Sequence, residues 1–171
     1  MSLDRMRLHT YQELQTFVAT AQEVREELEQ LVGRELGVDF ASLDVLEAFL
    51  LGRYPTVEAG LTLDQRGVLD AAARQVGLVL ILGIQGARWD INLENGKDVY
   101  YRLPVVALPD GSVECPISMV TAALDRRTGS YLSAIAEALA QDCDAPPISK
   151  GSTKPRPKSR PPKSGRRSGR R

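Results

Sequence analysis

The chain has 171 residues, with 22 Lys or Arg, 22 Asp or Glu and a hydrophobic content of 43%. This composition is typical of a soluble globular protein and excludes a chain that is unfolded throughout. The charges are separated along the sequence, because residues 150–171 hold ten basic residues and no acidic one, and residues 1–149 hold 12 basic and 22 acidic residues. A formal net charge of zero therefore combines a body near −10 with a tail near +10.

The two parts are expected to differ in order. Residues 1–147 have the length of one domain and enough apolar residues for a core, so we predict a single acidic domain. Residues 148–171 consist almost entirely of Pro, Gly, Ser, Lys and Arg, which provide little apolar surface to offset the entropy lost on folding. We therefore predict that this Pro/Lys/Arg-rich tail is disordered.

Several features that the sequence lacks bear on the cellular location of the protein and on whether it binds a cofactor or a metal. The longest apolar stretch, Val76–Ile84, is far shorter than the ~20 residues that span a bilayer, and no apolar run follows the charged N-terminal residues. Cys115 and Cys143 are too few for a disulfide framework and have no CxxC spacing for zinc. We expect a cytoplasmic protein with free thiols, no membrane span, no cofactor and no metal site.

Three helices are predicted in the N-terminal half. Thr10-Tyr-Gln-Glu13 is a capping-box pattern, and apolar residues at three- and four-residue steps continue it to about Leu36, with Gly37 as the expected stop. A second helix is expected over residues 42–51, ended by Gly52 and by Tyr54-Pro55.

The third helix is expected to begin at the capping pattern Thr62-Leu-Asp-Gln65 and to stop near Gly83 or Gly86. Its second half is apolar on all sides, which predicts a central, buried helix. A strand over residues 78–84 is the competing interpretation, since a short apolar run does not separate the two and Gly77 weakens a helix.

Residues 88–117 are typical of an antiparallel meander of three strands. Asn95-Gly96 is a hairpin signal, and Pro109-Asp-Gly111 is a turn in which Pro sets φ and Gly accepts a positive one. Pro104 indicates that the middle strand is bent or lies partly at an edge.

Helical spacing returns over residues 117–124 and 131–139, which predicts one or two closing helices. The expected fold class is α+β: three N-terminal helices, a three-stranded antiparallel meander, one or two C-terminal helices and then the basic tail.

Residues 62–140 resemble small uncharacterised bacterial α+β domains. The resemblance is carried by the long buried helix ending in Gly86-Ala-Arg-Trp89, a short hairpin, a Pro at the start of a later strand segment and a terminal helix that bears Tyr. In that family a glycine-spaced helix precedes a Gly-x-x-Trp entry into a sheet. The resemblance implies a bacterial source and an α+β fold, and it implies no catalytic residue.

Catalysis finds no support in the motifs. His9 is the single histidine and precedes the first helix, where no packing would hold it as a base. No glycine-rich phosphate-binding pattern is present in a suitable context. Trp89 could be an exposed stacking platform, but a lone Trp at the start of a strand is more typical of a core residue. We therefore predict that the chain is not an enzyme.

The tail is the main candidate for binding. Its spaced cations can follow the phosphates of DNA or RNA without reading bases, although lipid headgroups, the protein's own acidic body and a solvated extension without function are alternatives. The expected nucleic-acid contacts are Lys150, Lys154, Arg156, Lys158, Arg160, Lys163, Arg166, Arg167, Arg170 and Arg171.

A second candidate surface is the acidic face of the first helix. Glu23, Glu26, Glu27 and Glu29 lie opposite its apolar stripe and form either a solvated face or a docking surface for a basic protein partner. The sequence thus favours a binding or adaptor module that contacts nucleic acid non-specifically. The alternative is an inhibitor or immunity-type protein whose acidic body neutralises a basic partner such as a nuclease toxin.

Overall fold

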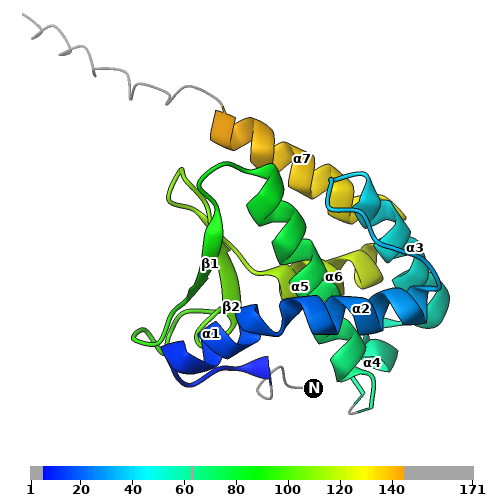
Figure 1. Ribbon diagram of the computed structural model, residues 1–171, viewed down its shortest axis with the longest axis horizontal. Helices are drawn as coiled ribbons and strands as arrows, with labels where there is room; N and C mark the ends of the chain where they lie inside the picture. Colours follow the sequence, from blue (N-terminus) through cyan, green and yellow to red (C-terminus); the bar gives the residue numbers. More distant parts are fainter. Residues whose placement is uncertain (1–5, 63, 145–171) are drawn as a thin grey trace, which may run out of the picture.

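The computed structural model describes residues 6–62 and 64–144, and this part of the chain is an α+β fold of seven helices and one three-stranded antiparallel sheet (Figure 1). The predicted α+β class is thereby confirmed, although five helices, not three, precede the sheet. The predicted tail lies outside the described residues. The elements are α1 Tyr11–Ala19, α2 Ala21–Val32, α3 Ser42–Arg53, α4 Val57–Gly60, α5 Arg66–Gly83, β1 Arg88–Ile91, β2 Pro104–Ala107, β3 Val113–Glu114, α6 Pro116–Arg126 and α7 Tyr131–Asp144.

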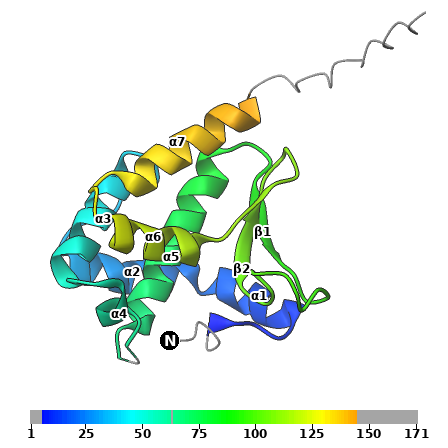
Figure 2. The same ribbon diagram turned by 180° about the vertical axis from the view of Figure 1, so that it is seen from behind.

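Helix α5 runs through the centre of the molecule. It packs against α2 on one side and α6 on the other, as the front and back views show (Figure 1, Figure 2). The sheet adjoins α5 and α6 at one end of the molecule, and α3 pairs with α7 at the other. This central position explains why the second half of α5 is apolar on nearly all sides. Among the described residues, no helix combines the length and the apolar content needed to cross a membrane.

The first predicted helix is in fact two helices. Its start is confirmed, because Thr10 Oγ1 accepts a hydrogen bond from the Glu13 backbone N–H at 3.1 Å. The helix then breaks at Thr20, which separates α1 from α2. Helix α2 ends at Gly33, whose φ of 81° is left-handed, so the expected stop at Gly37 is wrong.

Side-chain hydrogen bonds explain the break. The Thr20 hydroxyl donates to the Thr16 carbonyl at 2.9 Å, a local bond that competes with regular helix. Arg74 of α5 donates to the Phe17 carbonyl and, at 3.0 Å, to Thr20 Oγ1. A residue more than fifty positions away thus binds polar groups at the break, which local periodicity alone does not show.

The helix predicted over residues 42–51 is α3, and it begins at Ser42 as expected. It continues to Arg53, and Tyr54 is extended, as the residue before a proline should be. The expected helix with a stop near Gly83 is α5, which is helical through most of residues 78–84, so the strand alternative is wrong.

The segment between α3 and α5 differs from the prediction. The Thr62–Gln65 pattern does not cap α5, because the Thr62 hydroxyl donates to the Ala59 carbonyl at 3.1 Å and the helix begins only at Arg66. An additional short helix, α4, precedes it, and Thr56 caps that helix by accepting from the Ala59 N–H at 3.3 Å.

Two glycines in α5 are explained by aromatic rings that lie directly on the helix. A Cβ at Gly77 would lie 2.0 Å from Trp89 Cη2, and a Cβ at Gly83 would lie 2.4 Å from two atoms of the Phe40 ring. An aromatic ring therefore packs directly against the helix backbone at each of these two positions, where a Cβ would collide with it. The helix accepts the lower propensity of glycine because the rings bury apolar surface against it.

The three-stranded antiparallel meander is confirmed, with strand order β1-β2-β3. The turn between β2 and β3 forms where predicted, and Gly111 has the expected positive φ, 89°. Pro104 is the first residue of β2 and pairs with Ile91 of β1. Only Val106 and Ala107 of β2 pair with β3, so at Pro104 the strand has a neighbour on one side only. The expectation that the strand lies partly at an edge is thereby confirmed, and Pro104 is tolerated there as the first residue of the strand.

β1 and β2 form a hairpin as predicted, but the tight turn expected at Asn95-Gly96 is replaced by a longer connection over residues 92–103. Residues 92–103 leave the sheet as a series of turns, in which Asn92 Oδ1 accepts from the backbone N–H groups of Glu94 and Asn95, each at 3.0 Å. Arg102 has a left-handed φ of 64°, and its carbonyl accepts from the Leu8 N–H at 2.7 Å. The N-terminal segment thus lies along this loop.

Both closing helices form, as α6 and α7. A buried carboxylate joins α7 to α3: Glu47 is 0% exposed and accepts from the N–H groups of Gly129 and Leu132, each at 2.8 Å. Three residues earlier on α3, Asp44 accepts from the Ser133 hydroxyl. Two acids of α3 therefore satisfy groups at the N-terminal end of α7, where the helix dipole favours negative charge.

Candidate functional site

The predicted acidic face lies on α2. Glu23, Glu26 and Glu27 are exposed, and none of the three is in an ion pair with a described residue. Gln22 Nε2 donates to the Glu26 carboxylate at 3.0 Å. The structure thus places three predicted residues together on one exposed helical surface.

Glu29, the fourth predicted residue, has an internal role. Its carboxylate pairs with Arg25 at 3.1 Å and accepts from the Leu36 N–H at 3.0 Å, and Arg25 donates to the Leu36 carbonyl. These contacts hold the segment after α2 against the helix. Glu29 therefore stabilises the segment that follows α2, and the exposed acidic surface is smaller than the sequence suggests.

An exposed apolar residue also lies on α2. Leu31 falls at the helical spacing expected of the inward apolar stripe, yet its side chain is 50% exposed. It follows Glu27 by four residues, so the two side chains are neighbours on the helix surface. Leu28, three residues earlier, is the buried residue of α2, so helical spacing alone does not decide which of the two leucines is buried.

The ten predicted nucleic-acid contacts, between Lys150 and Arg171, lie outside the described residues. Several carboxylates lie near the last described residues of the chain, at the C-terminal end of α7. Burial raises the pKa of the Cys143 thiol of α7, and the nearby Asp110 carboxylate and the neighbouring Asp144 and Asp142 raise it further. Burial, and then Asp110, likewise raise the pKa of Glu114. The C-terminal end of α7 and the β2–β3 turn thus form an acidic end of the body.

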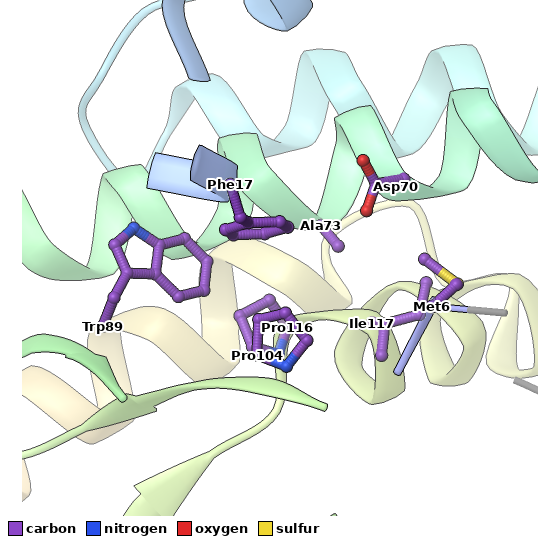
Figure 3. A pocket seen from close by; sticks show the side chains of 8 residues that line it. All are labelled: Met6, Phe17, Asp70, Ala73, Trp89, Pro104, Pro116 and Ile117. Carbon is purple, nitrogen blue, oxygen red and sulfur yellow. The ribbon is translucent and has the colours of Figure 1, made fainter. Parts of the chain in front are cut away.

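A hollow lies between the N-terminal segment, α1 and the first half of α5. It is open, with a volume of about 390 Å³, and is lined by Met6, Leu8, Phe17, Arg66, Gly67, Asp70 and Arg74. A small apolar recess adjoins it, with room for about one water molecule. Figure 3 shows that recess, in which Phe17 and Trp89 face Pro104 and Pro116.

The charged groups of this hollow are already engaged. Arg74 Nε pairs with Asp70 at 2.8 Å, and its guanidinium lies 3.8 Å from the centre of the Phe17 ring as well as bonding the α1–α2 break. Arg66 Nε donates to the Leu61 carbonyl at 3.4 Å. The lining contains no Ser, Cys or His, so it offers no nucleophile paired with a base. Its described contacts stabilise the fold.

Trp89 packs against the core and is half-buried. Its ring meets Phe17 edge to face, with centroids 5.2 Å apart and planes at 82°, and it lies on the backbone of Gly77. The partly exposed ring also lines the recess of Figure 3. The packing agrees with the core interpretation more closely than with an exposed stacking platform.

His9 and Cys115 are the remaining candidates for chemistry among the described residues. His9 is exposed, and its Nδ1 lies 3.1 Å from Arg102 Nη1. Cys115 is buried, which raises the pKa of its thiol and makes the thiolate less available. Within the described residues, no group of three or more His, Cys, Asp or Glu side chains could hold a metal ion.

Comparison with protein-family models, with characterised proteins and with solved structures finds no match to this chain. The resemblance of residues 62–140 to bacterial α+β domains therefore stays a prediction, and the interpretation of function depends on the charge distribution and on the surfaces described above.

Proposed function

We propose that the protein is a non-enzymatic binding module whose basic tail contacts nucleic acid without sequence preference. The separation of charge carries this proposal: all 22 acidic residues precede position 145, and ten of the 22 basic residues follow position 149. The acidic body repels a polyanion, so the tail is the part of the chain suited to contact one. Its 22 residues can extend over roughly 65–70 Å in a proline-rich conformation.

The recognition expected of such a tail is electrostatic. Lys and Arg side chains spaced by Pro, Ser and Gly can follow phosphates, but no folded element places them in a groove to read bases. Engagement of five cations predicts a slope of about −4 to −5 when log affinity for duplex DNA is plotted against log salt concentration.

The test measures binding of the full chain to two duplexes of unrelated sequence over a range of salt concentrations. We expect equal affinities for the two duplexes and a steep salt dependence. Replacing Lys154, Arg156, Lys158, Arg160 and Lys163 with Gln should reduce the slope by about 4. The matched control replaces three exposed basic residues of the body, Arg34, Arg88 and Lys97, with Gln. An unchanged slope in the tail variant, or strong discrimination between the duplexes, would contradict the proposal.

The second candidate function is inhibition of a basic protein partner, such as a nuclease, by the acidic body. The observation that favours it is the exposed face of α2, which presents Glu23, Glu26 and Glu27, with the half-exposed Leu31 one turn after Glu27. Carboxylates provide electrostatic steering, and an exposed apolar residue beside one of them can be buried on contact; both are usual parts of a protein interface.

This second function predicts that a Glu23→Gln/Glu26→Gln/Glu27→Gln variant loses inhibition of a basic nuclease that the wild-type chain inhibits. Nuclease activity is assayed against the full chain at low and at physiological salt. The control variant changes three exposed glutamates elsewhere on the body, Glu58, Glu94 and Glu137, to Gln. Equal loss in both variants would mean that net charge, and not the α2 face, governs the contact.

A further inference from the structure

A second groove lies on the outer face of the sheet. It has a volume of about 230 Å³, and its walls include Asp90 of β1, Val105 of β2, Val113 of β3 and the loop residues Asp98 and Tyr100. The groove is more apolar than polar, with two carboxylates in its lining. All three strands and the 92–103 loop therefore contribute to one surface.

The strand register places this groove on the side of the sheet that faces away from α5. Trp89 pairs with Val106, and the Trp89 ring packs on α5, so these residues mark the inner face. Asp90 pairs with Val105, and successive residues of a strand point to opposite faces, so the groove lies on the outer one. Val113 there is 44% exposed. Val105 is only 4% exposed, so the apolar surface that is open on the outer face comes from Val113 and the partly exposed Tyr100.

Backbone hydrogen bonds hold both carboxylates of the groove in place, and Asp90 Oδ1 accepts from the Ile91 N–H at 2.8 Å. Asp98 accepts from the Tyr100 N–H at 2.8 Å and from Asn92 Nδ2 at 2.7 Å, and these two hydrogen bonds lower its pKa. Neither Asp98 nor Asp90 is in an ion pair with a described residue. A partly apolar groove with a tyrosine and two carboxylates that no described cation pairs with suits an extended segment in which prolines alternate with cations.

The chain itself contains such a segment. Lys154-Pro-Arg-Pro-Lys158 alternates cation and proline, as the groove requires. We propose that the groove on the outer sheet face binds residues 154–158 of the same chain. The cations would contact Asp90 and Asp98, and the prolines would lie on Tyr100 and Val113.

The position at which the described chain ends supports this occupant. Helix α7 ends at Asp144, and Cys143 lies beside Asp110 in the turn between β2 and β3, which belong to the same sheet. Nine residues, 145–153, lie between position 144 and Lys154, and the ten steps of ~3.1 Å each can span about 30 Å. A four-residue strand is only about 13 Å long, so the tether is long enough to reach the groove. A short tether also provides an effective concentration on the order of millimolar.

This contact does not depend on the proposed nucleic-acid function, but it bears on it. A tail segment held in the groove is unavailable to phosphates, so the two contacts would compete. The body would then reduce affinity for nucleic acid by occupying the cations as well as by repelling the polyanion.

The test attaches a nitroxide spin label to the full chain, in a Ser152→Cys/Cys143→Ser variant, and records amide and methyl NMR signals in the absence of nucleic acid. We expect line broadening concentrated at Val105, Val113 and Tyr100, unchanged on dilution and removed by high salt. The accompanying Asp90→Asn/Val113→Lys change should abolish it, because it removes one carboxylate and places a cation on the groove. Both substitutions leave the Asp98 hydrogen bonds intact.

The control is a Glu26→Gln/Glu27→Gln change on α2, which should leave the broadening unchanged. Broadening concentrated on α2, or absent from the sheet, would overturn the proposal, and broadening that disappears on dilution would assign the groove to the tail of a second copy. The salt dependence of DNA binding is measured separately and tests the proposed function whichever of these results is obtained. A failure of the groove proposal is therefore distinguishable from a failure of the proposed function.

Discussion

Gly77→Ala is expected to destabilise the protein by about 2–3 kcal/mol, although alanine is a better helix former than glycine. The new Cβ would lie 2.0 Å from Trp89 Cη2 and 2.3 Å from Cζ2, so the ring must leave its seat on α5. Displacement would also disturb its edge-to-face contact with Phe17. Urea denaturation followed by far-UV circular dichroism measures the change.

The effect should reverse when the ring is absent. Trp89→Ala alone should cost about 3 kcal/mol, near the lower end for aromatic truncation because the ring is half-buried. In that background Gly77→Ala removes no contact, and the higher helix propensity of alanine should stabilise the protein by up to about 1 kcal/mol. The double-mutant cycle then has a coupling energy of about 3 kcal/mol.

Gly67 provides the matched control on the same helix. A Cβ there would meet nothing within 4 Å, so Gly67→Ala should be neutral or slightly stabilising. If Gly77→Ala costs the same with and without the Trp89 ring, the ring does not lie on this glycine and the packing between α5 and β1 must be different.

These glycines also show how far the sequence predicts the fold. Apolar spacing and turn residues were sufficient for α3, α5, the β2–β3 turn and the two closing helices. They failed where a distant side chain decides the local structure. The break at Thr20 depends on Arg74, and the glycines of α5 are explained only by rings that lie far away in the sequence or on another element.

The candidate surfaces were predicted less completely than the fold. Exposure of Glu23, Glu26 and Glu27 agrees with the predicted acidic face, since charged residues on the polar side of a helix are usually exposed. The bracing role of Glu29 could not be seen, because its partner Leu36 comes near only after Gly33 reverses the chain. The groove on the outer sheet face could not be predicted, because the sequence favours a tight turn at Asn95-Gly96 and gives no sign of the longer 92–103 connection that forms one wall of the groove.

Glu47 was also missed, although the sequence contains a signal for it. It lies at helical spacing with Leu43 and Leu50, and all three side chains are fully buried. A carboxylate on the apolar stripe of a helix must find donors or be excluded from the core. Its donors lie at the start of α7, more than eighty residues later. Helical spacing can therefore show that a buried carboxylate needs hydrogen-bond donors, but it cannot show which groups donate.

Replacement of this carboxylate should therefore be among the most damaging single changes in the chain. Glu47→Ala leaves the N–H groups of Gly129 and Leu132 without their acceptor and opens a cavity, so we expect a loss of about 3–5 kcal/mol. Glu47→Gln retains the shape and one oxygen but turns an amide donor toward a backbone donor, which should cost about 2 kcal/mol. Glu26→Ala, at an exposed site on α2, should change stability by less than about 0.5 kcal/mol.

The positions at which hydrogen exchange accelerates distinguish capping of α7 by Glu47 from a general contribution of Glu47 to packing. Because Glu47 caps α7, hydrogen exchange in Glu47→Gln should accelerate first at Gly129, Leu132 and the following turn of α7, while amides in the α2–α5 contact keep their protection. Asp44→Ala should show a weaker form of the same pattern, since Asp44 contacts the Ser133 hydroxyl and no backbone amide of α7 among its described hydrogen bonds. Uniform acceleration across all helices in Glu47→Gln would instead mean that the carboxylate stabilises the core as a whole. The attachment of α7, and with it the point from which the basic tail departs, would then depend on packing rather than on this cap.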